Sequence, residues 1–307
     1  MKNYFDFNLT GKKFFPYWIV YFLLAIVPNA IVNSQGQGQS PGVLSIVVGI
    51  FVFFVYIFMY FYFIKLTING VSLKEKLFNF NGDVFVFAGK MLIGTILSMI
   101  TLFIYMPWFI KDITKYLVNN TSYKGNNFDF KATGGSLFLV FLLGFLVPMI
   151  IIGVIMSQAM DPMNFNPILP MIMSLVMLIV MVPFMYLTYK WMVNIDYKEY
   201  HITWKTDAVE SIMMIFGQML LAIITIGIYA PMAYLKIFKY FIDRTVAVKE
   251  GDERNFGFDI DPMNDFLFIW GQLLLCIITL LIYFPWAFTK INKRFAQRTF
   301  VTGEISE

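Results

Sequence analysis

Long stretches of this 307-residue chain lack charged side chains, which restricts its possible folds more than any other feature. Hydrophobic residues make up 59% of it and charged residues 14%, whereas a soluble domain carries about 25% charged residues. Seven apolar segments are each long enough to cross the roughly 30 Å of hydrocarbon in a bilayer. They span residues 14–32, 43–64, 84–110, 137–156, 167–191, 208–234 and 265–288. We therefore predict an all-α polytopic membrane protein.

Three short motifs recur at an offset of 123 or 124 residues. The pairs are Phe-Asp-Phe at 5–7 and 128–130, Ser-Gln at 34–35 and 157–158, and Ile-Thr-x-x-Ile-Tyr-x-Pro at 100–107 and 224–231. The last motif appears a third time at 278–285. This recurrence predicts an internal duplication in a 3+3+1 arrangement of the segments. The predicted boundaries are 1–127 for the first repeat unit, 128–250 for the second, and 251–307 for a partial third copy.

Two stretches between apolar segments alternate apolar and polar residues, as β-strands do. One surrounds Asn69-Gly70, a strong short signal for a hairpin turn, and the other runs from Val193 to Trp204. The Phe-x-Phe triplet at 256–258 also has strand period. Lone hairpins are marginally stable in water. We therefore predict that these short β-hairpins gather into a small layer at the membrane surface.

A family resemblance rests on one sequence motif. Its core is Ile-Thr-x-Gly-Ile-Tyr-x-Pro-Trp, which is followed by Lys, Tyr and Thr and then by Phe-x-Phe. The chain resembles the YjgN-like bacterial inner-membrane proteins, also described as domain of unknown function 898. Its copies lie at 100–108, 224–232 and 278–286, and only the second keeps the glycine, Gly227, with Met232 in place of the tryptophan. The resemblance implies a bacterial cytoplasmic membrane and no established activity.

Basic residues indicate how the segments are oriented. The linkers 33–42 and 157–166 contain no lysine or arginine, whereas every other connection and both termini contain several. If all seven segments cross, the halves are inverted repeats, as in many transporters, but lysines then lie on both sides. If only the first, second, fourth and fifth cross, every basic linker faces the cytoplasm, with both termini and the hairpins. We favour this second arrangement, in which the other three segments enter and return on one side, although 84–105 is long enough to span alone.

Those three segments share a threonine, a tyrosine and a proline at fixed spacing, and proline suits the first turn of a new helix. A break inside a bilayer leaves backbone groups that water, a solute or hydroxyl groups must satisfy. We predict that these groups, with two glutamines seven residues before their threonines, line a shared polar cavity. In the alternative, the glutamines only join helices, and the prolines mark segment ends beside Trp108 and Trp286. The candidate residues are Thr101, Tyr105, Pro107, Gln218, Thr225, Gly227, Tyr229, Pro231, Gln272, Thr279, Tyr283 and Pro285.

Residues for catalysis are scarce. His201 is the only histidine and Cys276 the only cysteine, and no Cys/His/carboxylate cluster has metal-ligand spacing. We therefore predict that the protein is not an enzyme and has no catalytic residue, metal or cofactor. Lys90 is the one ionisable residue well inside a segment, and snorkelling to the interface explains it, which disfavours a carboxylate-driven proton pump.

The leading functional hypothesis is a transporter or channel-like protein with a pathway among the Pro-broken segments. The alternative is a non-transporting accessory or scaffold protein that binds other membrane proteins or lipids. A hydrated central cavity would favour the first, and a filled core with a broad apolar flank the second. The net charge of +4 is spread along the chain, so the expected partners are membrane lipids, other membrane proteins or a second copy, and not nucleic acid.

Overall fold

Ten short strands close into an antiparallel barrel in the computed structural model, which describes residues 1–28, 30, 43–159 and 168–303. Strands consecutive in the chain are neighbours in the barrel, and β10 pairs with β1 to close it. The strands are β1 (Lys2–Phe7), β2 (Val71–Leu73), β3 (Lys76–Phe80), β4 (Thr121–Tyr123), β5 (Asn126–Phe130), β6 (Ile195–Tyr197), β7 (Tyr200–Trp204), β8 (Thr245–Lys249), β9 (Asp252–Phe258) and β10 (Thr299–Thr302).

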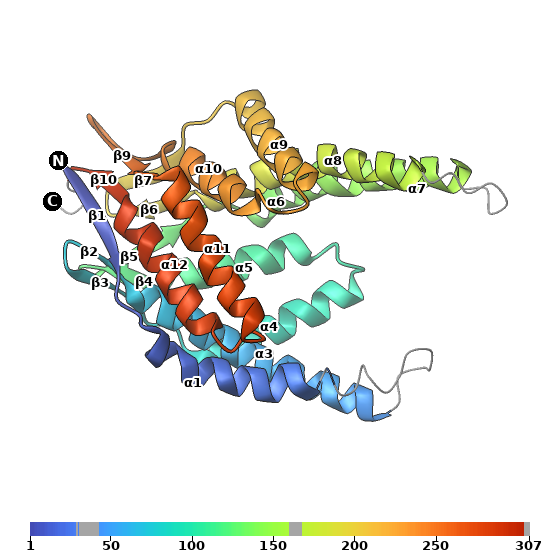
Figure 1. Ribbon diagram of the computed structural model, residues 1–307, viewed down its shortest axis with the longest axis horizontal. Coiled ribbons are helices and arrows are strands. Elements are labelled where there is room, and N and C mark those ends of the chain that lie inside the picture. The colour runs from blue at the N-terminus through green and yellow to red at the C-terminus, as the bar shows by residue number, and fades with distance from the viewer. Residues whose placement is uncertain (29, 31–42, 160–167, 304–307) are drawn as a thin grey trace.

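Helices occupy every second connection between these strands, and two-residue turns occupy the others. The five helical connections extend from one end of the barrel (Figure 1). In chain order they are α1 (Gly11–Tyr21), the π-helix η1 (Phe22–Ile26) and α3 (Val43–Gly70); α4 (Val84–Ile100) and α5 (Met106–Asn119); α6 (Gly134–Phe141), the π-helix η2 (Leu142–Leu146), α7 (Val147–Ala159) and α8 (Ile168–Met192); α9 (Ala208–Ile224) and α10 (Ala230–Ile242); α11 (Pro262–Ile278) and α12 (Phe284–Arg298). We call the first and third of these the long hairpins and the other three the short hairpins.

The predicted all-α fold with seven segments in a 3+3+1 arrangement is therefore wrong. The sequence predicts short β-hairpins that gather into a small layer at the membrane surface. The strands, of three to seven residues each, instead pair around a complete barrel, in which β1 joins β10 across almost the whole chain. Asn69-Gly70 is also not a hairpin turn. It ends α3, where Asn69 Oδ1 accepts a hydrogen bond from Phe80 N at 2.7 Å, and the turn follows at Lys74-Glu75.

Only two helices of the described residues are long and apolar enough to cross a membrane, by length and composition, instead of seven segments. They are Ser45–Gly70 and Gly134–Val154. Within the most apolar 18-residue stretch of each, only 11% and 6% of the residues are buried, so these are not core helices. The third, sixth and seventh predicted segments are each broken into a short hairpin. The Ser-Gln pair at 34–35 lies outside the described residues, and the boundaries 1–127, 128–250 and 251–307 stay a prediction.

Aromatic side chains fill much of the barrel interior. Tyr123 and Tyr197 are almost fully buried, and Tyr197 Oη donates to the carbonyl of Tyr123 at 2.8 Å while Tyr123 Oη donates to that of Leu73 at 2.9 Å. The first residues of the four strand triplets at 5–7, 78–80, 128–130 and 256–258 pack into this cluster, as Phe128 does against Tyr197 with ring centroids 4.6 Å apart. Each phenol thereby meets its hydrogen-bonding need on a barrel carbonyl, so the interior stays apolar.

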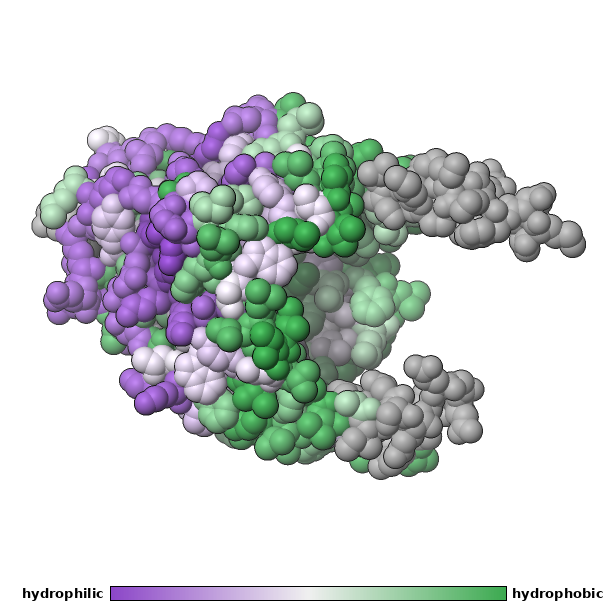
Figure 2. All heavy atoms as spheres, in the orientation of Figure 1, coloured by the Kyte–Doolittle hydropathy of each residue, from purple (hydrophilic) through white to green (hydrophobic). Residues whose placement is uncertain are grey.

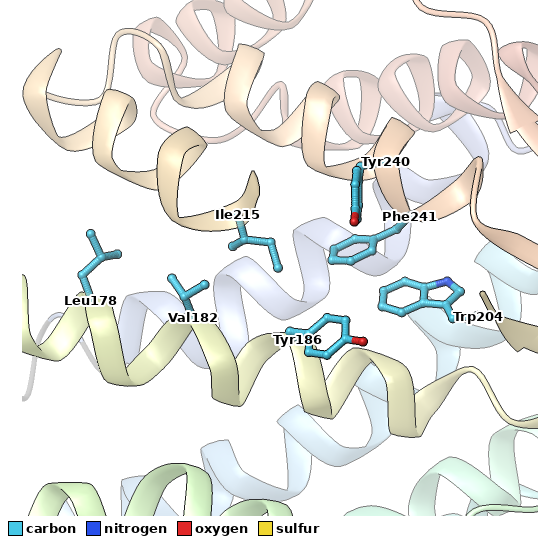
Figure 3. Close-up of a cluster of buried hydrophobic side chains, with 7 residues drawn as sticks. All are labelled: Leu178, Val182, Tyr186, Trp204, Ile215, Tyr240 and Phe241. Carbon is cyan, nitrogen blue, oxygen red and sulfur yellow. The ribbon is translucent and has the colours of Figure 1, made fainter. Parts of the chain in front are cut away.

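A second layer of aromatic residues joins the barrel to the hairpins. In Figure 3, Trp204 from β7 lies against Phe241 from α10, with ring centroids 4.0 Å apart, and Tyr186 from α8 lies beside them. The buried face of α8 meets Ile215 of α9 in the same cluster. Neighbouring hairpins thus share one core, and the barrel fixes where each one starts.

Candidate functional site

The three predicted Thr–Tyr–Pro motifs form the tips of the three short hairpins. At the first tip, α4 ends at Ile100, Leu102 and Phe103 adopt positive φ values of 49° and 67°, and α5 begins two residues after Ile104. The other tips repeat this conformation at Ile226-Gly227 and Leu280-Leu281. Pro107, Pro231 and Pro285 each lie in the first turn of the returning helix, as predicted.

A threonine hydroxyl links the two helices at each tip. Thr101 Oγ1 donates to the Leu97 carbonyl at 2.7 Å and accepts a hydrogen bond from Tyr105 N at 3.0 Å. Thr225 and Thr279 make the same pair of bonds at 2.8 and 3.0 Å and at 2.7 and 3.0 Å. Each hydroxyl therefore closes the end of one helix and caps the start of the next.

The remaining backbone amides of the tips also find partners within them. Phe103 N donates to the Ser98 carbonyl at 2.6 Å, Ile104 N to Thr101 at 3.0 Å and Met106 N to Phe103 at 3.1 Å. The same bonds recur at the other two tips. A turn whose amide donors are satisfied internally can lie in hydrocarbon, where water is not there to pair with them.

Large apolar side chains project from these tips. Leu102 is 83% exposed, Ile226 93% and Leu280 77%. Figure 2 shows hydrophilic residues gathered over the barrel and hydrophobic residues over the hairpins, which surround a recess. The two ends of the molecule therefore suit different surroundings.

In two of the three short hairpins, the predicted glutamine pairs with the predicted tyrosine. Tyr229 Oη donates to Gln218 Oε1 at 2.9 Å, and Tyr283 Oη to Gln272 Oε1 at 3.1 Å. A lysine completes the second group, since Lys290 Nζ donates to Tyr283 Oη at 2.8 Å. These bonds join the two helices of one hairpin, as the alternative interpretation expects. The polar cavity shared by all three hairpins stays a prediction.

A cavity of about 760 Å³ lies where the barrel meets the returning helices. Aromatic residues dominate its wall, and none of the twelve sequence-predicted residues belongs to it. The barrel contributes Phe5, Phe78, Tyr123, Phe128, Tyr197 and Phe256, and α10 and α12 contribute Tyr234, Phe238, Phe288 and Phe295. The Phe-x-Phe triplets were a signal for it, because their first residues face this space from four different strands.

The threonine and asparagine side chains of the cavity wall bond to carbonyls of helices in the same hairpins. The hydroxyls of Thr67, Thr245 and Thr299 donate to carbonyls four residues earlier, at 2.7, 2.9 and 2.8 Å. Asn292 Nδ2 donates to the Phe288 carbonyl at 2.8 Å. Among the described residues, the wall includes no charged side chain. The arrangement can therefore hold an apolar chain, and it offers little to a hydrated ion.

Charged residues pair on the outside of the barrel instead. Lys131 lies 2.5 Å from Asp129 and 3.3 Å from Asp196, and these contacts lower the pKa of the Asp129 carboxyl and raise that of Lys131. His201 Nδ1 lies 2.7 Å from Asp196. In the described part of the chain, no three His, Cys, Asp or Glu side chains are placed to hold a metal ion. The pairs tie neighbouring strands together.

Comparison with known proteins identifies a family and nothing more specific. A family model described as "Bacterial protein of unknown function (DUF898)" matches residues 2–257, from β1 into β9. No curated protein and no solved structure matches the chain.

Proposed function

The chain belongs to the DUF898 family of bacterial proteins of unknown function, and we propose that it is a membrane protein whose cavity binds the apolar chain of a lipid without transporting it. The aromatic wall of the cavity carries this proposal. At about 760 Å³, the cavity is within the roughly 300–1,000 Å³ range of small-molecule sites. Each buried methylene contributes about 0.8 kcal/mol, so eight carbons of an acyl chain would gain about 6 kcal/mol.

The apolar hairpins support a place in the bacterial cytoplasmic membrane. The two long hairpins contain the two helices suited to crossing it, and few residues of their apolar stretches are buried. The polar barrel lies at the opposite end from the hairpin tips (Figure 2). With the basic connections and both termini on the barrel side, the positive-inside rule directs the barrel to the cytoplasm.

The same features give less support to the transporter or channel predicted first. A pathway among the Pro-broken segments needs polar groups that exchange partners with a solute or with water. In the described tips, the threonine hydroxyls and backbone amides bond within the turn, and the projecting side chains are apolar. The cavity supports the lipid-binding form of the alternative hypothesis, because it is lined by rings and aliphatic groups.

A cavity-filling variant tests lipid binding. Val193 lines the cavity, whereas Val209 lies outside it and is 71% exposed, so Val193→Trp and Val209→Trp add the same group in two places. We expect Val193→Trp to weaken binding of a fluorescent fatty acid to the detergent-solubilised protein by at least about tenfold, since several buried methylenes are displaced. Val209→Trp should bind as the parent does. Native mass spectrometry should show co-purified lipid on the parent and Val209→Trp only.

Thermal unfolding of both variants shows whether each is folded, and Ile291→Trp, also in the wall, replaces Val193→Trp if that variant unfolds. Equal fatty-acid binding by a folded cavity variant and the parent would exclude this cavity as the site.

A further inference from the structure

We propose that the three short hairpins enter only the barrel-side leaflet while the two long hairpins cross the bilayer, so that the protein is a wedge that favours and produces membrane curvature. This inference rests on the membrane placement proposed above, and it is independent of lipid binding in the cavity.

In the short hairpins, the first lysine of each returning helix is close to the tip. Lys236 follows Ile228 by eight residues and Lys290 follows Ile282 by eight, which is about 12 Å of helix. Lys111 follows Ile104 by seven residues, or about 10 Å. Lysine snorkels to the headgroup level. The apolar depth of each returning helix therefore matches one leaflet, about half of the roughly 30 Å hydrocarbon layer.

In the long hairpins, the corresponding distance is a full bilayer. Lys65 lies 22 residues from Val43 along α3, and Lys190 lies 22 residues from Ile168 along α8, which is about 33 Å in each case. Figure 1 shows both long hairpins extending beyond the tips of the three short ones. The described helices of the long hairpins thus reach farther from the barrel than the tips of the short ones.

The conformation of the tips indicates that they lie in lipid. Leu102, Ile226 and Leu280 hold φ values of 48–49°, a left-handed conformation that costs roughly 1–2 kcal/mol for a residue with a side chain. Glycine or asparagine would relieve that strain in a turn facing water. Burying a Leu or Ile side chain in hydrocarbon contributes about 1.5–3 kcal/mol. The free energy gained when the side chain is buried in lipid therefore outweighs the backbone strain. In water, the strain would remain and the apolar side chain would also be exposed.

The two leaflets then hold different amounts of protein. Among the described residues, five hairpins place ten helical arms in the barrel-side leaflet, and the two long hairpins continue four of them into the other. A helix with its side chains is about 10–12 Å across, so six additional arms displace on the order of 500–700 Å² more lipid from the barrel-side leaflet. A leaflet that is expanded relative to its partner bends to become the convex side. The barrel should therefore lie on the convex face.

Tip depth and vesicle preference together test the wedge. A nitroxide on Ile226→Cys, in a Cys276→Ser background, should report by electron paramagnetic resonance a depth near the bilayer midplane. The full chain should also be reconstituted into a mixture of small sonicated and large extruded vesicles. We expect the number of protein molecules per membrane area to be at least about three times higher in the small vesicles, because insertion into one leaflet is sensitive to curvature. A nitroxide at the far headgroups, or equal density in both vesicle classes, would overturn the proposal.

Two sets of tip variants isolate the cause. The triple change Leu102→Asn, Ile226→Asn and Leu280→Asn keeps a residue that tolerates positive φ, so the fold is retained, and it should abolish the preference for small vesicles. The matched triple change to Met keeps apolar tips and should preserve the preference. Unchanged preference in the Asn variant would overturn the wedge while leaving fatty-acid binding intact. Release of the parent from membranes by alkaline carbonate would instead overturn the membrane placement and, with it, this inference.

Discussion

Asp259 shows at the scale of one residue how the barrel is closed. Its carboxylate accepts hydrogen bonds from Tyr4 Oη at 2.6 Å and from Lys2 Nζ at 2.9 Å, both on β1. Its backbone N–H donates to the carbonyl of Arg298, the last residue of α12, directly before β10. One residue thus connects the first strand, through its side chain, to the chain just before the last strand, through its backbone, and the bonds from Tyr4 and Lys2 lower the pKa of its carboxyl.

This lowered pKa predicts a pH-dependent contribution to stability. An aspartate whose pKa is lower in the folded than in the unfolded chain stabilises the fold above its unfolded pKa of about 3.9, and the contribution is lost as the pH falls through the folded pKa. Asp259→Asn should therefore unfold at a lower temperature than the parent at pH 7. Below pH 4, the two melting curves should converge. An equal gap at pH 7 and pH 3 would show that the charge has no part in it.

Position 94 shows why some equivalent residues escaped the sequence comparison. Gly94 occupies the place that Gln218 and Gln272 hold in the other short hairpins, and a Cβ there would lie 2.0 Å from the ring of Phe109. The residues that correspond to Phe109 are Ala233 and Ala287. A large ring on one helix thus replaces a long amide on the other. The glutamines could be predicted from their spacing alone. The exchange at Gly94 becomes apparent only when the residue that faces it on the neighbouring helix is known.

At the scale of elements, each tip threonine connects the two helices of its short hairpin through hydrogen bonds. Thr225→Val removes both bonds of the hydroxyl and leaves Tyr229 N without its partner. We expect a loss of about 1–2 kcal/mol in unfolding free energy, the usual range for a helix cap. Thr114→Val is the matched control, since its hydroxyl bonds only to the Ile110 carbonyl of its own helix. Denaturant unfolding in mild detergent measures the unfolding free energy of both variants. Equal losses would contradict a special role of the Thr225 hydroxyl in connecting the two helices.

Helix breaks were predictable from the sequence and strand pairing was not. Proline and threonine act within a few residues, so their spacing was enough to place the breaks before Pro107, Pro231 and Pro285. Each strand, in contrast, has three to seven residues and owes its stability to partners that the chain brings back later. Local alternation could show that strands exist, but it could not show that they close a barrel or enclose a cavity.

Across the whole molecule, the hairpins form a ring that closes with the barrel. Trp286 of α12 packs on Gly11 of α1, and Trp108 of α5 packs on Gly134 of α6. Both tryptophans therefore lie between neighbouring hairpins. A Cβ added at Gly11 would lie 2.5 Å from Trp286 Cδ1. The glycine is needed because the ring leaves no space at that contact.

Gly11→Ala should therefore destabilise the protein by about 1–3 kcal/mol, as overpacking does. Gly217, inside α9, has open space where a Cβ would lie, with no neighbouring group within 4 Å, so Gly217→Ala should be neutral or stabilise by about 0.5–1 kcal/mol. Thermal unfolding of the two variants side by side distinguishes ring closure from a general effect of alanine. Similar melting temperatures for both would mean that the α1–α12 contact adjusts freely.

The pairing of β1 with β10 also sets the order of events during synthesis. The ribosome makes Asn3 almost 300 residues before its partner Val301, so the hairpins emerge one after another while the sheet between them still has two free edges. A free edge is a template for joining another chain. Only the arrival of β10 removes both edges at once. Quality control could therefore distinguish finished from unfinished molecules by a single feature, an unpaired strand at the edge of the sheet.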